Sequence, residues 1–167
     1  MNDTKTASKF VISRTFNAPR DRVWKAWTEP EQMAQWWGPK GFSADVKTLD
    51  LKPGGKFHYR MLSPQGEEMW GRMIFREIVP KERLVFINSF SDPQGGLTRH
   101  PLAPEWPLQM HTTISFAEEN GGTTVTVTWV PYEASESECE TFDKGTESMQ
   151  AGWTGTFDKL ERHLGDA

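Results

Sequence analysis

The chain has 167 residues, with 19 lysines and arginines against 23 aspartates and glutamates, and a formal net charge of −4. This length predicts one domain, and mild acidity without a long basic run argues against nucleic-acid binding. No apolar run reaches the roughly 18 residues of a membrane-spanning helix, so we expect no membrane insertion. The chain start lacks the apolar core of a secretory signal, and the single cysteine, Cys139, cannot form an internal disulfide, so we expect the cytoplasm.

Large apolar side chains are abundant, with eight tryptophans, ten phenylalanines and seven methionines. Aromatic groups dominate the energetics of cores and pockets, and methionine adapts to irregular gaps. The composition therefore predicts either a large core or an internal cavity, and it does not choose between them.

The N-terminal part predicts a tail, a strand and two short helices. Residues 1–9 are polar and are expected to form a frayed, disordered tail. Alternating apolar residues predict a strand over Phe10–Phe16. A helix is expected after Pro19, because apolar residues then recur at helical spacing. Thr28 and Glu31 have the spacing of a capping box and predict the start of a second short helix.

Most of the remaining chain has the pattern of strands. Period-two alternation and turn signals predict six strands, at residues 42–51, 55–63, 68–79, 83–91, 108–118 and 123–131. The short turns between them predict an antiparallel meander. The stretch from Asp92 to Pro107 is longer and rich in proline, which is typical of a functional lid or mobile segment.

The C-terminal part predicts one long helix. Apolar side chains from Phe142 to Leu164 recur at three- to four-residue intervals, with acidic residues before them and basic residues at the end, which suits the helix dipole. Gly145, Gly152 and Gly155 weaken the helix propensity, but they allow a backbone or a ligand to approach closely. The expected fold is α+β: a curved antiparallel sheet of six or seven strands wrapped around this helix, with two short helices after the first strand and a gap beneath the long helix.

Strand alternation and the helix stripe predict which side chains face that gap. The candidate cavity residues are Phe57, Tyr59, Met61, Met73, Phe75, Phe86, Asn88, Met110, Thr112, Trp129, Met149 and Trp153. The candidate mouth or lid residues are Trp37, Arg99 and Trp106. For each apolar residue, packing in a solid core is the alternative interpretation. We also expect that the adjacent Trp36 and Trp37 cannot both face the same core.

Three polar side chains interrupt the apolar face. Asn88 and Thr112 need hydrogen-bond partners if they are buried, and a neighbour, a water molecule or a ligand can provide them. The hydroxyl of Tyr59 could orient a ligand. His58 and His111 fall on the opposite face, so we expect them to be exposed rather than catalytic. No His-x-x-x-His or Cys-x-x-Cys spacing occurs, so we expect no metal and no cofactor.

Several motifs carry a resemblance to a known family. They are Arg14-Thr15-Phe16-Asn17-Ala18-Pro19, Trp36-Trp37-Gly38-Pro39, Asp50-Leu51-Lys52-Pro53-Gly54-Gly55-Lys56-Phe57 and Gly152-Trp153. In order and spacing they resemble the activator-of-heat-shock-ATPase homologue-like (AHSA-type) family, which belongs to the START-like, SRPBCC helix-grip superfamily. The resemblance covers residues 10–164 and implies a single START-like domain there.

What the resemblance implies is a ligand cavity rather than a defined reaction. A small hydrophobic or aromatic molecule is expected between the sheet and the terminal helix, with no catalytic residue set to carry over. An enzyme of polyketide cyclase-like type and a co-chaperone-type interaction module stay open as alternatives. The family's eukaryotic activators carry a further N-terminal domain that is central to stimulating the chaperone, so we do not expect a chaperone partner. An uncovered edge strand could pair with a second copy and give a homodimer.

Overall fold

The computed structural model describes residues 8–38, 41–100 and 103–165, so most of the predicted tail at residues 1–9 lies outside the described residues. The strands are β1 (Phe10–Phe16), β2 (Ser43–Leu49), β3 (Lys56–Leu62), β4 (Glu68–Val79), β5 (Arg83–Ser91), β6 (Leu97–Thr98), β7 (Met110–Glu119) and β8 (Gly122–Pro131). The helices are α1 (Arg20–Thr28), α2 (Pro30–Trp36), α3 (Glu136–Lys144) and α4 (Thr146–Gly165). The predicted strands are all present, and β6 is an additional short strand within the long predicted loop.

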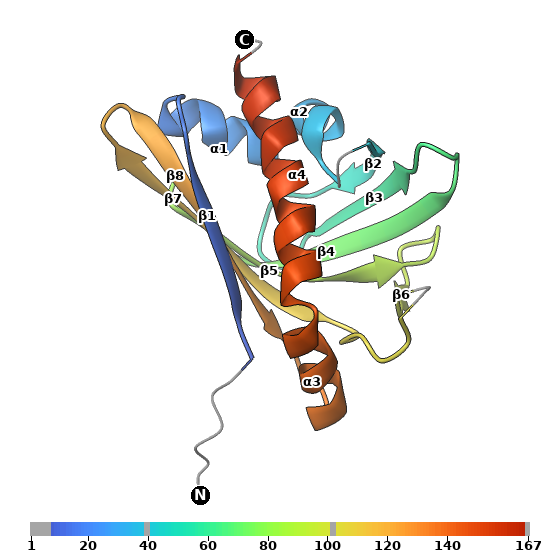
Figure 1. Ribbon diagram of the computed structural model, residues 1–167. Helices are drawn as coiled ribbons and strands as arrows, with labels where there is room; N and C mark the ends of the chain where they lie inside the picture. Colours follow the sequence, from blue (N-terminus) through green and yellow to red (C-terminus); the bar gives the residue numbers. More distant parts are fainter. Residues whose placement is uncertain (1–7, 39–40, 101–102, 166–167) are drawn as a thin grey trace, which may run out of the picture.

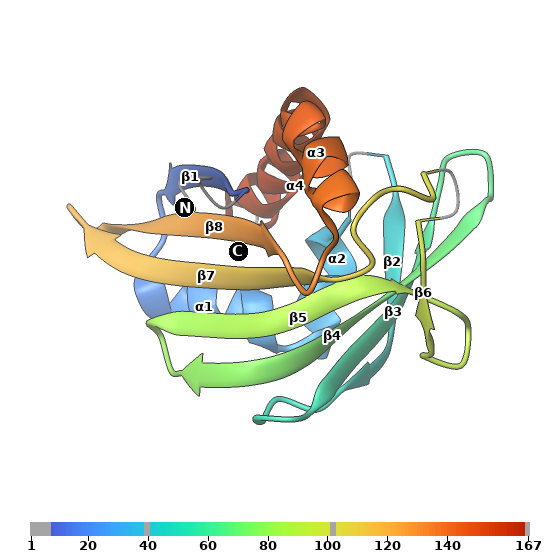
Figure 2. The same ribbon diagram turned by 90° about the horizontal axis from the view of Figure 1, so that it is seen from below.

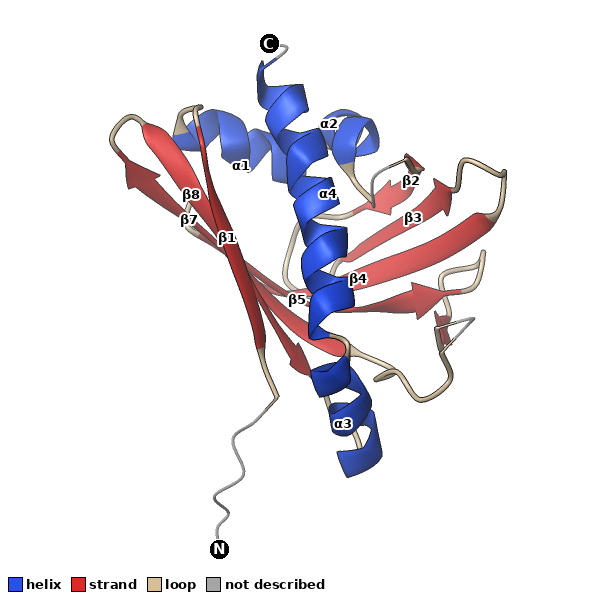
Figure 3. Ribbon diagram, in the orientation of Figure 1, coloured by secondary structure: helices blue, strands red, loops and turns tan. Residues whose placement is uncertain are grey.

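The strands form an antiparallel sheet in the order β1-β8-β7-β5-β4-β3-β2, with β6 paired to β5. Figures 1 and 3 show this sheet curved into a cradle, with α4 lying across its concave face and α1 and α2 at one end. Figure 2, turned by 90°, shows α3 and α4 on the same side of the sheet. The predicted α+β helix-grip fold is therefore confirmed. Within the described residues, no helix is both long and apolar enough to cross a membrane.

The strand register arranges the inward side chains in rows across the sheet. The first three rows are Tyr59–Gly71–Phe90, Phe57–Met73–Asn88–Met110 and Phe75–Phe86–Thr112–Trp129. A further row is Leu84–Ile114–Val127–Ile12. The residues that alternation predicted to point inward therefore share the concave face.

One half of the concave face is filled by aromatic side chains from the helices. The rings of Trp24 and Trp27 in α1 lie 5.4 and 6.0 Å from the ring of Phe116. Phe16 of β1 packs edge-on against Phe157 of α4 at 5.5 Å. We call this region, beneath α1, α2 and the C-terminal half of α4, the closed half.

The expectation that Trp36 and Trp37 cannot face one core is wrong. Both side chains are buried, and their rings lie 4.8 and 5.9 Å from the ring of Trp27. α2 ends at Trp36, and Trp37 has an extended backbone, which breaks the helical spacing between the two side chains. The change of backbone conformation therefore allows two adjacent residues to reach the same neighbour.

The capping box predicted at Thr28 and Glu31 is wrong, and one forms elsewhere. Thr28 still belongs to α1, and its hydroxyl donates to a carbonyl one turn earlier. Because α2 begins with a proline, the preceding Glu29 is extended and becomes the N-cap instead. At the start of α3, Ser135 and Glu138 form a capping box in which each side chain accepts from the other's backbone N–H.

The prediction of one unbroken terminal helix is corrected at Gly145. This residue is the C-cap of α3, and its N–H donates to the carbonyl of Phe142 before α4 begins at Thr146. A Cβ at Gly145 would lie only 3.0 Å from the indole ring of Trp106. The absence of a side chain at Gly145 therefore leaves room for Trp106, which comes from the long connection between β6 and β7.

His58 lies on the outer face as predicted, but it is buried rather than exposed. Its ring stacks on Trp70 at 5.2 Å, and its Nε2 atom is 3.2 Å from the carbonyl oxygen of Asp92. The turn from Asp92 to Gly96 covers it, and this long-range contact leaves no mark in strand alternation. His111 is half-buried.

Candidate functional site

A cavity of about 660 Å³ lies between the concave face of the sheet and the N-terminal part of α4. Inward side chains of β3, β4 and β5 form its floor, together with Met110 of β7 and Trp129 of β8. Phe42 and Gly38, in the connection between α2 and β2, contribute to one side. Residues 103–108, which we call the cover segment, and the junction of α3 and α4 contribute the rest of the wall. We call this region the open half of the concave face.

Most of the candidate cavity residues line this space. They are Tyr59, Met61, Met73, Phe86, Asn88, Met110, Trp129, Met149 and Trp153, together with the predicted mouth residues Trp37 and Trp106. The structure thus brings together side chains from five strands, from α4 and the end of α2, and from the long connection. Whether any of them touches a ligand stays a prediction.

Three candidate cavity residues face inward without reaching the cavity wall. Phe57 is covered by the ring of Tyr59, which stacks on it at 4.8 Å. Phe75 packs against Phe86 at 6.1 Å. Thr112 is fully buried, and its hydroxyl donates to the Oδ1 atom of Asn88.

Arg99, expected at the mouth, does not line the cavity but fastens its cover. Its Nη1 atom lies 2.7 Å from Glu138 in α3, and it donates to the carbonyls of Pro104 and Trp106 at 3.4 and 3.3 Å. The pKa of Glu138 is lowered, first by the Ser135 backbone N–H of the capping box and further by Arg99. The cover segment is therefore held to α3 by an ion pair near the surface.

Among the lining residues that the sequence analysis missed, two groups show what signal was present. Met69 and Gly71 continue the inward alternation of Met73 backwards along β4, so the same signal could have found them. The other group consists of small residues on one side of the terminal helices: Thr141, Gly145, Ser148, Gly152 and Thr156. Their spacing of three to four residues is a helical stripe, but a stripe of small side chains is weak evidence for a cavity until the opposite wall is known.

The absence of a side chain at Gly152 and at Gly71 has different consequences. A Cβ at Gly152 would meet no atom within 4 Å, so this position on α4 borders open space. A Cβ at Gly71 would lie 2.4 Å from the Cζ and Oη atoms of Tyr59. Gly71 is therefore required for the Tyr59 ring to lie across β4, whereas Gly152 leaves volume empty.

The wall beside α2 is fixed by α4. Lys159 donates from Nζ to the carbonyls of Trp37, Gly38 and Phe42, the last at 2.7 Å. The hydroxyl of Thr156 donates to the carbonyl of Gly38 at 3.1 Å. Burial lowers the pKa of Lys159. These bonds hold the Trp37 side chain at the border between the closed and open halves.

Polar side chains are sparse in the cavity wall. Tyr59 and Asn88 face it from the floor, and Lys144 lies at its exposed rim. His100 lines it beside Phe90, with the two rings 4.7 Å apart, and burial lowers the pKa of His100. Among the described lining residues none is aspartate or glutamate. No group of three His, Cys, Asp or Glu residues in the described chain is placed to hold a metal ion.

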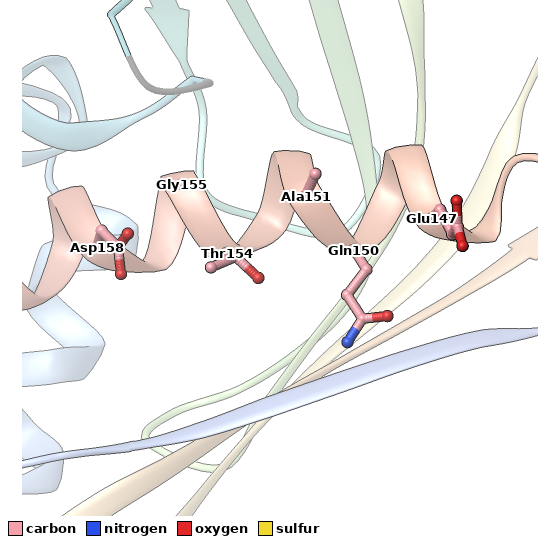
Figure 4. Close-up of a pocket in the computed structure, with 6 residues that line it drawn as sticks. All are labelled: Glu147, Gln150, Ala151, Thr154, Gly155 and Asp158. Carbon is pink, nitrogen blue, oxygen red and sulfur yellow. The ribbon is translucent and has the colours of Figure 1, made fainter.

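A second, open groove of about 510 Å³ lies on the opposite side of α4. Figure 4 shows that all its lining residues come from this one helix: Glu147, Gln150, Ala151, Thr154, Gly155 and Asp158. It is open to solvent and gathers no converging chemical groups. The deeper cavity beneath α4 is therefore the better candidate for a functional site.

An α+β domain whose sheet grips a long helix above an internal cavity defines a class of helix-grip protein. Within that class, a family model described as "Activator of Hsp90 ATPase homolog 1-like protein" matches residues 17–165. The chain belongs to this family, and the resemblance noted from its motifs is confirmed. No curated protein matches the chain in sequence.

Solved structures are similar over nearly the whole chain. A solution structure of a protein from Arthrobacter aurescens has a TM-score of 0.80 and 27% identity, covering 96% of this chain and 88% of that one. The crystal structure of protein Ms6760 from Mycobacterium smegmatis has a TM-score of 0.75 and 25% identity, covering 95% and 91%. DynU16, a putative protein in the dynemicin biosynthetic locus, has a TM-score of 0.66 and 20% identity, covering 95% and 48%, and shows the fold alone.

Proposed function

We propose that this chain binds a small, largely apolar molecule in the cavity beneath α4. The proposal is carried by one observation: half of the concave face is filled by aromatic rings, while the other half holds a partly open cavity of about 660 Å³. Pockets for small-molecule ligands have volumes of about 300–1,000 Å³ and mostly apolar walls with a few placed polar groups. The cavity agrees with that description in both respects.

The side chains of the wall suit a guest of variable shape. Five methionines line it, at positions 61, 69, 73, 110 and 149. Methionine is unbranched and polarizable, so it adapts to irregular surfaces at little cost. Trp37, Trp129 and Trp153 add flat surfaces on which an aromatic guest can pack.

The first experiment fills the cavity from the helix. Gly152→Leu places an apolar side chain into the open space above the floor, and we expect it to abolish stabilisation by apolar compounds in a thermal-shift screen. Gly152→Ala is the matched control, because its methyl group meets no atom within 4 Å and leaves most of the volume. Equal ligand responses of the two variants would contradict binding in this cavity.

The second experiment looks for a natural guest. Native mass spectrometry of the protein purified from its own host should show a small-molecule mass that Gly152→Leu fails to retain. The same spectrum reports the number of subunits and so tests whether a second copy pairs with this chain. If no compound stabilises the wild-type protein and no mass excess is retained, the proposal is wrong.

A further inference from the structure

Two polar side chains on the cavity floor flank Gly71 of β4. Tyr59 of β3 is paired with Gly71 of β4, which is paired with Phe90 of β5. Asn88 is two residues before Phe90, on the same face of β5, and it also lines the cavity. Asn88 is therefore diagonal to Gly71 on the adjacent strand, a separation of about 7–8 Å that long side chains can span, and the Tyr59 hydroxyl lies over Gly71, 2.4 Å from where its Cβ would be. A ligand group over Gly71 can therefore meet both side chains.

The Tyr59 hydroxyl is held in place, and its oxygen interacts weakly with the Trp37 indole N–H, which leaves the hydroxyl proton free for an acceptor. Its ring is fixed between Phe57, stacked at 4.8 Å, and Trp37, edge-on at 5.9 Å, and its Oη atom lies directly over Gly71. Burial raises the pKa of Tyr59 to about 12, while the nearby Trp37 indole opposes part of that rise. The hydroxyl therefore keeps its proton at neutral pH and can donate it.

The Trp37 indole N–H is a second donor beside the hydroxyl, and it is only weakly engaged. Its Nε1 atom is buried and, within the described residues, makes no hydrogen bond of normal geometry; its weak hydrogen bond to the Tyr59 oxygen lowers the pKa of Tyr59. A buried N–H without a partner is costly, and an acceptor close to Tyr59 would relieve that cost.

Asn88 is oriented so that its amide nitrogen is the available group. Its Oδ1 atom accepts a hydrogen bond from the Thr112 hydroxyl, a fully buried neighbour on β7. This bond occupies the carbonyl end of the amide, and the Nδ2 atom has no partner in the part of the chain that the structure describes. An amide nitrogen can only donate. Thr112 is thus a positioning residue for a donor on Asn88.

From these groups we infer that the guest of the cavity carries an uncharged carbonyl oxygen, as in a ketone, ester or amide, which accepts hydrogen bonds from Tyr59 and Asn88. The inference rests on the proposed ligand binding and names the chemistry that it selects. A carboxylate is a poorer match, because the Lys144 ammonium is at the exposed rim, away from these floor donors. A pure hydrocarbon is also poorer, because it would leave every donor unpaired.

The test uses a pair of probes that differ only at one position: 9-fluorenone, which has a carbonyl, and fluorene, which has a methylene there. We expect fluorenone to bind the wild-type protein at least about 5-fold more tightly, since each net hydrogen bond is worth about 2- to 10-fold in affinity. Tyr59→Phe should weaken fluorenone by about 5-fold and leave fluorene unchanged. The infrared carbonyl band of bound fluorenone should move to lower frequency in the wild type and move back in Tyr59→Phe.

Matched variants separate this inference from the proposed function. Tyr132→Phe is the control, because the Tyr132 hydroxyl accepts from Arg76 and Tyr132 does not line the cavity. Asn88→Leu removes the other donor and provides a second test if Tyr59→Phe is poorly folded. If both probes bind equally and neither variant discriminates between them, the inference is overturned while ligand binding stands. If neither probe binds, the proposed function fails and the inference fails with it.

Discussion

The closed and open halves of the concave face share one sheet and one alternation of inward side chains, yet only one of them is solid. In the closed half, tryptophans from α1 and α2 fill the space against Phe116 and Trp27. In the open half, the helix above the sheet contributes glycine, serine and threonine beside Met149. The difference is therefore set by the covering helices and not by the strands.

The border between the halves is a wall of indole rings. Trp153 of α4 stacks on Trp27 at 6.3 Å towards the closed half and meets Trp129 at 5.8 Å at the cavity wall. Trp37 contacts Trp153 at 5.9 Å and is held by Lys159 through its backbone. Because large rigid rings resist collapse, this wall explains how one core can hold an empty region without closing over it.

The largest expected effect is a loss of folding stability when either of two buried methionines is replaced by alanine. Met33 in α2 belongs to the closed half, and Met73 on β4 lines the cavity; their exposed fractions are 2% and 3%. Methionine-to-alanine changes in cores cost about 2–5 kcal/mol, with larger costs where the site is tightly surrounded. We expect Met33→Ala towards the upper end and Met73→Ala near about 2 kcal/mol in urea denaturation of the ligand-free protein. Equal costs would show that the open half is as well packed as the closed half.

The strands and their inward faces could be predicted because burial imposes a period of two on the sequence. Phe86, Asn88 and Phe90 on β5 show this clearly, and the register places their partners Thr112, Met110 and Thr98 next to them. The same alternation continues along β4 to Met69 and Gly71, which also line the cavity. The floor of the site was thus largely predictable from local alternation.

The segments and side chains that cover the sheet were harder to predict, because their positions depend on contacts between residues far apart in the sequence. Phe57 faces inward like its neighbours, but the Tyr59 ring covers it. His58 is hidden by the turn after Asp92, and Arg99 reaches α3 instead of the mouth. Thr28 and Glu31 also have the spacing of a capping box. Pro30 between them makes Glu29 the N-cap of α2, whereas no proline interrupts the capping box that forms at Ser135 and Glu138. In each case the deciding partner lies outside the local pattern.

The next prediction uses glycine on the floor of the open half. Gly71→Ala would place a methyl group 2.4 Å from the Tyr59 ring, so the ring must move or β4 must shift. Overpacking of this kind costs about 1–3 kcal/mol. Thermal denaturation should show the loss, and adding Tyr59→Leu, which lacks the clashing atoms, should recover most of it. No recovery in the double variant would mean that the close approach is not the cause.

A glycine on the helix should respond in the opposite direction. Gly152 lies in α4 with open space beside it, so Gly152→Ala adds helix propensity without a clash. Alanine is favoured over glycine in helix interiors by up to about 1 kcal/mol. We expect a higher midpoint of thermal unfolding for this variant. A loss of stability would show that the space above the cavity is narrower than the structure indicates.

The smallest expected effect is a local loss of stability in the cover segment when its ion pair to α3 is removed. The closed half is held by buried rings, whereas the cover segment of the open half is tied to α3 by Arg99 and Glu138, whose side chains are 47% and 14% exposed. An exposed ion pair contributes at most about 1 kcal/mol. Arg99→Gln should therefore speed hydrogen exchange in the cover segment and leave α1 unchanged at neutral pH. Arg83→Gln, which breaks a similarly exposed pair with Glu77, is the control and should leave the cover segment unchanged.

The same ion pair predicts that the stability of the cover segment decreases at low pH. The pKa of Glu138 is lowered from its ordinary value of 4.5 by the Ser135 backbone N–H, and further by Arg99. A lowered carboxyl pKa means that its stabilisation is complete above the unfolded value and is lost as the pH falls through the folded value. Protection of the cover segment, corrected for intrinsic exchange rates, should therefore fall below pH 4.5 before that of α1, and Glu138→Gln should remove most of this difference. If the cover segment and α1 lost protection together, or if Glu138→Gln left their difference intact, the Arg99–Glu138 ion pair would not be the cause of the lower stability of the cover segment.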